Sequence, residues 1–186
     1  LDLNREIETH ISVIQKTFNA AFLKEIEKQG EIISRKIFKG GKVLFMGNGG
    51  SAADSQHISA EFVCKLSKIR QPLPAMTLTV DTSALTAIAN DYGYEHIFSR
   101  QISALCTAKD VVIGISTSGA SQNVVKGFAA ANQIGAYTIG FSGIEGFVGA
   151  NLDFDFKVLH NVTARIQEAH ILLGHLLCRV AEKAFV

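Results

Sequence analysis

A histidine and a glutamate lie four residues apart, shortly after a glycine-rich stretch. They are His57 and Glu61, within GNGGSAADSQHISAEF, which runs from Gly47 to Phe62. Residues four apart share one face of an α-helix, so an imidazole and a carboxylate would act on the same space. Such a pair could move protons or bind a metal ion, and a surface hydrogen-bonded pair is the alternative without chemistry. Few other charges occur before Lys65, which predicts a buried helix and favours the chemical interpretation.

The same stretch begins with a loop that could hold a phosphate group. Its residues are Gly47, Asn48, Gly49, Gly50 and Ser51. Glycines allow a ligand to approach the backbone closely, and the helix that follows presents unpaired N–H groups to an anion. A tight turn with a serine cap explains the same residues equally well, so this loop alone leaves phosphate binding open.

A second loop, STSGASQN from Ser116 to Asn123, favours phosphate binding more clearly. Capping the next helix needs one side chain, for which Ser121 is in the right place. Thr117 and Ser118 add further hydroxyl groups around a single glycine. Hydroxyls and backbone amides make a neutral cradle for a phosphate monoester, whereas the spacing does not match the GxxxxGK[ST] loop of nucleoside-triphosphate enzymes.

The last helical stretch offers further candidates. Gln167 and His175 are eight residues apart, which places them about 80° from each other around a helix, on the same half. His170 lies between them in sequence, beside the apolar positions, and we expect it to pack in the core. From the residues alone, a metal-binding role for Gln167 and His175 stays open.

Short apolar segments bounded by glycine and serine predict the strands that would position these residues. The segments are 42–47, 75–80, 111–116, 137–142 and 154–159, of which the second and the fifth are weaker. Helical stretches occur at 1–38, 51–67, 83–90, 98–106, 121–134 and 163–185. This alternation predicts an α/β three-layer sandwich with a five-stranded parallel sheet. We expect one domain over 1–186, with N-terminal helices at 1–39 packing on it and ligands bound at the carboxyl ends of the strands.

The composition excludes some classes of partner. The 186 residues carry a formal net charge of +1, which argues against nucleic-acid binding. No run of 18 apolar residues occurs, and the charged start does not match a signal peptide, so no membrane partner is expected. Cys64, Cys106 and Cys178 lack a CxxC spacing and indicate buried thiols in a reducing compartment. A cytoplasmic location is the expectation.

Four motifs together resemble one branch of the sugar-isomerase (SIS) domain family, whose members isomerise sedoheptulose 7-phosphate. The motifs are GNGGSAADSQHISAEF, TAIANDYGYEHIFSRQ, STSGASQN and TARIQEAH, in the family's order and spacing from about Gly41 to the end. The serine-rich loop is common to SIS domains. HxxxE combined with RIQE and a histidine eight residues after its glutamine is much more specific. The resemblance implies the flavodoxin-like form of the three-layer fold.

The resemblance also implies an activity and a set of ligands. The activity is conversion of sedoheptulose 7-phosphate to D-glycero-D-manno-heptose 7-phosphate, the first step towards activated heptoses for lipopolysaccharide or another surface polysaccharide. A homotetramer with sites at subunit interfaces and one zinc ion per subunit are implied too. The implied zinc ligands are His57, Glu61, Gln167 and His175. The implied substrate-binding residues are Asn48, Gly49, Gly50, Ser51, Glu61, Asn90, Asp91, Ser116, Thr117, Ser118, Ser121 and Gln167.

This isomerisation lifts a proton from one carbon and returns it to its neighbour through an enediolate. We assign Glu61 as the carbon base and His175 as its acid–base partner, while zinc would polarise the carbonyl. A glutamate held tightly by zinc is a weak base, so one oxygen must stay free or the ligation must loosen. Ala164 departs from some members, which have an acidic residue three positions before the glutamine of RIQE.

Three alternatives to this activity agree less well with the sequence. A non-catalytic SIS protein that binds a phosphosugar or a replication initiator would be expected to lack one or more of the four zinc-ligand positions, all of which are present. An isomerase of another sugar phosphate is disfavoured by the RIQE-plus-histidine pattern, although sugar length is not readable from sequence. A dinucleotide-binding protein is least favoured, because the first glycine loop does not match GxGxxG with an acidic residue about 20 positions later.

Overall fold

The computed structural model describes residues 2–186, so Leu1 lies outside the described range. Within that range a five-stranded parallel sheet has the order β2-β1-β3-β4-β5. The strands are β1 Val43–Gly47, β2 Ala75–Thr77, β3 Val111–Ser116, β4 Tyr137–Ser142 and β5 Phe154–Lys157. The predicted parallel sheet is confirmed. The two weaker strands, β2 and β5, are shorter than the predicted segments.

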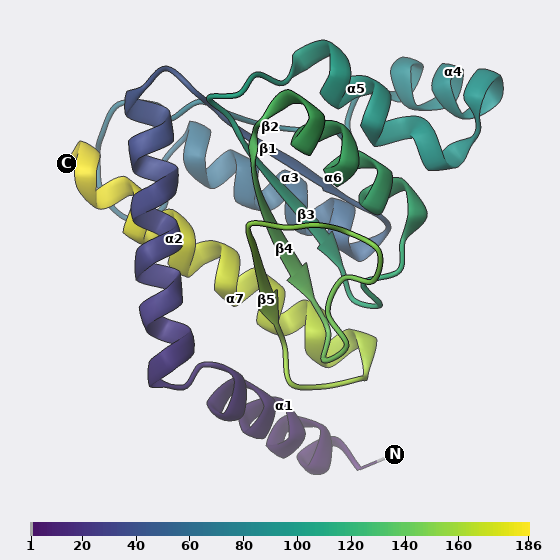
Figure 1. The fold of residues 1–186 in the computed structure, drawn as a ribbon. Helices are drawn as coiled ribbons and strands as arrows, with labels where there is room; N and C mark the ends of the chain where they lie inside the picture. Colours follow the sequence, from purple (N-terminus) through teal and green to yellow (C-terminus); the bar gives the residue numbers. More distant parts are fainter. Residues whose placement is uncertain (1) are drawn as a thin grey trace.

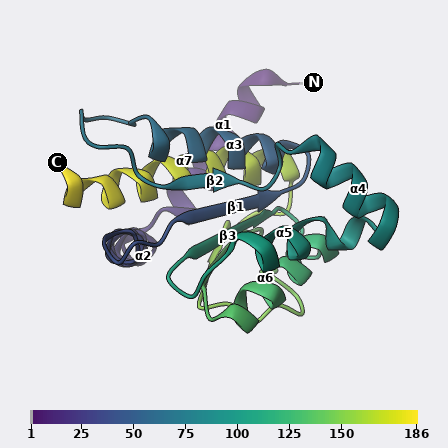
Figure 2. The ribbon, with the colours of Figure 1, turned by 90° about the horizontal axis from the view of Figure 1, so that it is seen from above.

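Helices cover both faces of the sheet (Figures 1 and 2). They are α1 Leu3–Thr17, α2 Ala20–Phe38, α3 Gly50–Val63, α4 Thr82–Tyr92, α5 Ile97–Leu105, α6 Gln122–Ile134 and α7 Thr163–Glu182, with 3-10 turns at Tyr94–His96 and Lys183–Phe185. The helix predicted at 51–67 ends at Val63, because the carbonyls of Glu61 and Phe62 accept hydrogen bonds from the Arg70 side chain. Within residues 2–186, no helix is both long and apolar enough to cross a membrane.

The sheet has a hydrophobic core on each face. Val43 and Phe45 of β1 belong to the core shared with α2, α3 and α7, whereas Leu44 and Met46 belong to the core shared with α5 and α6. Successive side chains of a strand point to opposite faces, which explains why β1 is apolar throughout. The three-layer arrangement predicted from the sequence is therefore confirmed.

The carboxyl ends of β1 and β3 lead into the two loops singled out in the sequence. Gly47, at the end of β1, pairs with Ile115 near the end of β3, so the loops 47–51 and 116–123 open side by side. The strand order reverses between these two strands, and such a switch point is where ligands bind in open α/β sheets. Gly49 has φ +54°, a backbone conformation that favours glycine.

Helices α3 and α7 pack against each other at Gly174. A Cβ atom added to Gly174 of α7 would lie 2.6 Å from Cγ1 of Ile58 in α3. Because glycine has no Cβ, the Ile58 side chain can pack directly against the α7 backbone at this point. His57 and His175 are the sequence neighbours of these two residues, so this contact brings their imidazole rings together in an edge-on arrangement.

The cysteines meet the expectation only in part. Cys178 is buried, Cys106 is half-buried and Cys64 is exposed just past the end of α3. Burial raises the pKa of Cys178 to about 12 and that of Cys106 to about 11. The expectation of buried thiols is therefore wrong for Cys64, because the chain leaves the core where α3 ends.

Candidate functional site

Three predicted ligand side chains meet where α3 faces α7. Nε2 of His57 lies 2.9 Å from Nε2 of His175 and 3.6 Å from Oε1 of Glu61. One ligand atom from each of the three lies within 4.8 Å of the others. Two nitrogen ligands at their usual bond length from a tetrahedral ion stand roughly 3.3 Å apart, close to the separation of the two imidazoles. The group therefore fits a divalent metal ion that accepts nitrogen and oxygen ligands.

The metal group, which is His57, Glu61 and His175, is more exposed to solvent than the sequence predicts. The side chain of His57 is 51% exposed and that of Glu61 is 23% exposed. The expectation of a buried α3 is wrong for His57, because the helix buries a different side, at Ser55, Ile58 and Phe62. A ligand from outside the chain can therefore reach the group.

The two loops line one cavity of about 290 Å³. Its lining is Asn48, Gly49, Gly50, Ser51, Ile115, Ser116, Thr117, Ser118, Ser121, Thr163 and Gln167. The Oγ atom of Ser116 lies 2.9 Å from Oγ of Ser121 and 3.4 Å from Oγ of Ser118. A cluster of hydroxyl groups beside the N-termini of two helices is suited to a phosphate group.

Ser121 occupies the position before α6 that was predicted for a capping residue. Its side chain makes no hydrogen bond to the backbone amides of α6 in the described structure. The predicted capping bond is therefore wrong, because the hydroxyl of Ser121 meets Ser116 across the cavity instead. This orientation makes the hydroxyl part of the cavity wall.

Gln167 lies against the first loop. A Cβ atom added to Gly50 would lie 2.9 Å from the amide carbon of Gln167, and Gln167 lines the cavity. His175 lies two helical turns further along α7. The helix therefore presents an amide at the cavity and an imidazole at the metal group, and it joins the two halves of the site.

The structure does not bring Asn90 and Asp91 to either half of the site. Both are exposed near the end of α4, where Nδ2 of Asn90 donates to Oδ1 of Asp91 at 2.7 Å. Against the rest of residues 2–186, α4 buries none of its own residues. A contact between this pair and a ligand in the cavity therefore does not follow from the subunit alone.

Two residues that support Asn48 were missed as candidates. Oδ1 of Asn48 accepts from the hydroxyl of Tyr94 at 2.9 Å and from Nδ2 of Asn123 at 2.8 Å, and Nδ2 of Asn48 donates back to Asn123 at 2.9 Å. These bonds fix the Asn48 amide at the edge of the cavity. The sequence could have pointed to Tyr94 and Asn123, because they belong to the same motifs as Asp91 and Ser121.

Asp54, one helical turn before His57, was also missed. Burial raises the pKa of its carboxyl group to about 6, and the charge of His57 opposes this change. Its Oδ2 atom is buried and has no hydrogen-bond partner among the described residues. The spacing of three residues from His57 was the signal that could have identified this carboxyl group as a neighbour of the site.

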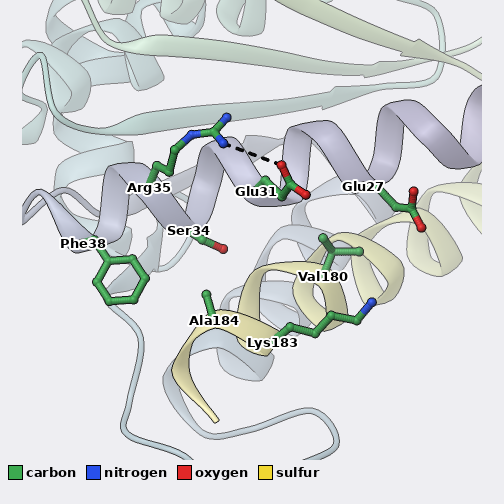
Figure 3. A pocket seen from close by; sticks show the side chains of 8 residues that line it. All are labelled: Glu27, Glu31, Ser34, Arg35, Phe38, Val180, Lys183 and Ala184. Carbon is green, nitrogen blue, oxygen red and sulfur yellow. Dashed lines mark ion pairs between the residues drawn. The ribbon is translucent and has the colours of Figure 1, made fainter.

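A larger hollow lies at the opposite end of α7 (Figure 3). Its volume is about 540 Å³, and it is lined by Glu27, Glu31, Ser34, Arg35, Phe38, Val180, Lys183 and Ala184. Arg35 pairs with Glu31 at 3.6 Å, so part of its charge is already neutralised. Lys183 is 16 residues from Gln167, or about 24 Å along a helix. We therefore place the functional site at the two loops and the metal group.

Known proteins share this chain's sequence and fold. The SIS domain profile matches residues 8–143. The chain is 47% identical to the phosphoheptose isomerase of Aquifex aeolicus, covering 98% of this chain and 96% of that protein. It is 46% identical to the phosphoheptose isomerase of Clostridium acetobutylicum, covering 97% and 93%.

Solved structures agree with these relatives. Phosphoheptose isomerase GmhA from Neisseria gonorrhoeae superposes with a TM-score of 0.87 at 41% identity, covering 96% of this chain and 97% of that one. A phosphoheptose isomerase from Francisella tularensis superposes with a TM-score of 0.91 at 32% identity, covering 97% and 96%. The similarity extends over nearly the whole chain, including both loops and both helices of the site. The chain therefore belongs to the SIS domain family and, within that family, to the phosphoheptose isomerases.

Proposed function

We propose that the chain interconverts sedoheptulose 7-phosphate and D-glycero-D-manno-heptose 7-phosphate. Nearly full-length similarity to phosphoheptose isomerases supports this reaction. The observation that carries the proposal is the meeting of His57, Glu61 and His175, from two distant segments, beside a cavity suited to phosphate. The product would supply activated heptose for lipopolysaccharide or another surface polysaccharide.

The two halves of the site suit the two ends of the sugar. We place the phosphate group among the hydroxyls of Ser116, Thr117, Ser118 and Ser121, next to the amides that begin α3 and α6. Gln167 at the cavity and His175 at the metal group are eight residues apart, or about 12 Å along α7. In an extended heptose 7-phosphate the phosphate and the carbonyl are at opposite ends, so one sugar would reach both.

The proposed proton transfers use Glu61 and His175. Glu61 removes a proton from C1 of the ketose and returns it to C2, while His175 moves a proton from O1 to O2. The enediolate between these steps carries negative charge on oxygen. A zinc ion held by His57, Glu61 and His175 would polarise the carbonyl and stabilise that charge. Gln167 lines the cavity, so its side chain would have to turn toward the metal group to serve as the proposed fourth ligand. Glu61 must keep one oxygen available for the carbon-bound proton.

We propose that residues 1–186 form a single SIS domain and that it acts as a cytoplasmic homotetramer whose sites are completed at subunit interfaces. The exposed α4, with Asn90 and Asp91, supports an interface of this kind, because a neighbouring subunit could cover it. The tetramer would then bring this pair to a bound sugar.

The test is incubation with sedoheptulose 7-phosphate while formation of the aldose is followed. We expect turnover that a metal chelator abolishes and that added Zn²⁺ restores. Hexulose and pentose phosphates serve as parallel substrates. Inertness toward sedoheptulose 7-phosphate together with turnover of a shorter sugar phosphate would replace the proposed substrate, and inertness toward all of them would contradict the isomerase activity.

A further inference from the structure

A buried ion pair lies outside the site, in the segment that follows α3. Nε of Arg70 donates to Oε2 of Glu182 at 3.2 Å, and the two side chains are 0% and 2% exposed. Arg70 belongs to the connection between α3 and β2, and Glu182 is the last residue of α7. The pair therefore joins the segment that follows α3 to the end of α7, the helix that carries His175.

Three of the other guanidinium hydrogens bind main-chain carbonyl groups. The Nη2 atom of Arg70 donates to the carbonyl of Glu61 at 2.9 Å, and Nη1 donates to that of Phe62 at 2.9 Å and that of Gln71 at 3.0 Å. The last carbonyls of a helix lack helical partners. Arg70 thus binds the end of α3 at the peptide group of Glu61, a residue of the metal group.

Glu182 is held from its other side as well. The hydroxyl of Ser67 donates to Oε1 of Glu182, so both carboxylate oxygens are engaged. Glu182 lies seven residues, or two helical turns, after His175 on α7. The close contact of Gly174 with Ile58 forms the second connection between the helices. Two separate points on α7 therefore fix its position against α3, and His175 lies between them.

Stability alone does not account for a pair of this kind. Removing two charges from water is costly, and well-packed apolar side chains of similar volume often give equal or greater stability. A planar guanidinium that binds one carboxylate and three carbonyls does fix geometry, since each bond requires its own direction. The burial and the number of partners thus favour a role in positioning.

We propose that Arg70 and Glu182 are positioning residues: they set the spacing of α3 and α7 and thereby the affinity of the His57–Glu61–His175 group for its metal ion. The inference rests on the metal-binding part of the proposed function. Partners that orient metal ligands typically contribute 10- to 100-fold to metal affinity. Arg70 would act through the backbone of Glu61, and Glu182 through the position of α7.

Three variants test the proposal by the Zn²⁺ affinity of the metal-free protein, measured in competition with a chromophoric chelator. Arg70→Met leaves the Glu182 charge buried, and Arg70→Met/Glu182→Met removes both charges. Arg70→Lys keeps a charge near Glu182 but loses the fork that binds three carbonyls. For each of the three we expect Zn²⁺ to bind about 10- to 100-fold more weakly.

The matched control is Lys42→Met. Nζ of Lys42 lies 2.7 Å from Oδ2 of Asp110, whose side chain is 1% exposed, and Lys42 directly precedes β1, at the end of the sheet opposite the loops. This variant also breaks a pair with a buried carboxylate, but it leaves α3 and α7 untouched. We expect its Zn²⁺ affinity to equal that of the wild type.

The double variant separates positioning from stability. We expect its thermal midpoint to lie within about 4 °C of the wild type, with the Zn²⁺ affinity still reduced. A folded double variant with wild-type affinity, or an equal loss in Lys42→Met, would overturn the proposal. If the double variant does not fold, the test rests on Arg70→Lys. Wild-type Zn²⁺ affinity in folded Arg70→Lys would also overturn the proposal.

The same experiment distinguishes the two proposals. The Zn²⁺ titration needs no sugar, so a wild-type protein that binds Zn²⁺ but does not convert sedoheptulose 7-phosphate contradicts the proposed substrate and leaves the positioning role intact. A wild-type enzyme with Zn²⁺-dependent turnover, alongside variants of unchanged Zn²⁺ affinity, contradicts the positioning role alone.

Discussion

The helix pair α3–α7 and the helix α4 carry different parts of the proposed site and are built differently. Helices α3 and α7 pack so closely that Gly174 has no room for a side chain, and a buried ion pair connects the ends of the two helices. Helix α4 carries Asn90 and Asp91 and buries none of its residues against the rest of the described chain. The arrangement of His57, Glu61 and His175 is therefore fixed within one subunit, whereas the proposed sugar contacts of α4 depend on what covers it.

The largest effect is expected at the metal group itself. Glu61→Gln removes the proposed carbon base and a metal ligand, so kcat/KM should fall by roughly 10²- to 10⁴-fold. The free energy of unfolding of the metal-free protein should change by less than about 1 kcal/mol, because glutamine has nearly the same shape as glutamate and the side chain is partly exposed. Steady-state kinetics and urea unfolding measure the two quantities. Glu31→Gln, on the exposed face of α2, is the control, and full activity of Glu61→Gln would end the assignment of Glu61 as the base.

The close packing of α3 on α7 is tested by a pair of glycine substitutions. An added Cβ at Gly174 would lie 2.6 Å from Cγ1 of Ile58, and one at Gly30 of α2 would lie 2.6 Å from Cβ of Val180 in α7. Both alanine variants overpack α7 and should lose about 1–3 kcal/mol of stability. Only Gly174→Ala pushes α7 away from α3, so we expect roughly 100-fold slower turnover there, because small misplacements are costly in catalysis.

Gly30→Ala supplies the comparison for this prediction. It should keep turnover within about threefold of the wild type, since the contact between α2 and α7 is remote from the metal group. Equal losses of turnover in the two variants would show that α7 transmits any disturbance to the site. The special importance of the α3–α7 contact would then be wrong.

Much of the fold was predictable because local patterns determine it. The segments 111–116 and 137–142 match β3 and β4 at both ends. A continuous apolar run bounded by polar residues or glycine is typical of a strand that is buried on both faces. Boundaries shifted where tertiary contacts decide them. Helix α3 ends at Val63 because Arg70, a residue beyond the predicted helix, donates hydrogen bonds to its last carbonyl groups.

The site was less predictable from local patterns than the fold. Spacing along a helix places His57 and Glu61 on one face, but it does not tell what lies opposite that face. The meeting of His57 with His175 joins positions 118 residues apart, and it was expected only from the resemblance to a family. The place of Gln167 over Gly50 and the buried pair of Arg70 likewise depend on how α7 crosses α3.

A smaller effect is expected from His170 on the buried side of α7. Burial lowers the pKa of its imidazole to about 4, below the ordinary value of 6.5. The unfolded chain therefore binds a proton that the folded chain does not, and the free energy of unfolding falls as the pH drops from about 6.5 to about 4. The loss from this residue should reach roughly 2 kcal/mol at pH 5.

Urea unfolding at pH 7.5 and pH 5 measures this loss. Comparison with His170→Gln isolates the contribution of His170, because other groups titrate in the same range and Asp54, whose pKa is raised to about 6, acts in the opposite direction. We expect the variant to lose less stability than the wild type over this pH interval. An identical loss would mean that His170 does not contribute to acid destabilisation.

The smallest effect on the protein itself is expected at α4. Asn90→Ala should change the free energy of unfolding by less than about 0.5 kcal/mol, because Asn90 is exposed and its helix has no fully buried residue in the described subunit. If a neighbouring subunit brings this helix to the sugar, the same change should lower kcat/KM by about tenfold, through the loss of one hydrogen bond to substrate. Ser83→Ala, exposed at the start of α4, should change neither quantity. An active Asn90→Ala variant would leave α4 outside the site, and a destabilised one would show that α4 packs more firmly than one subunit indicates.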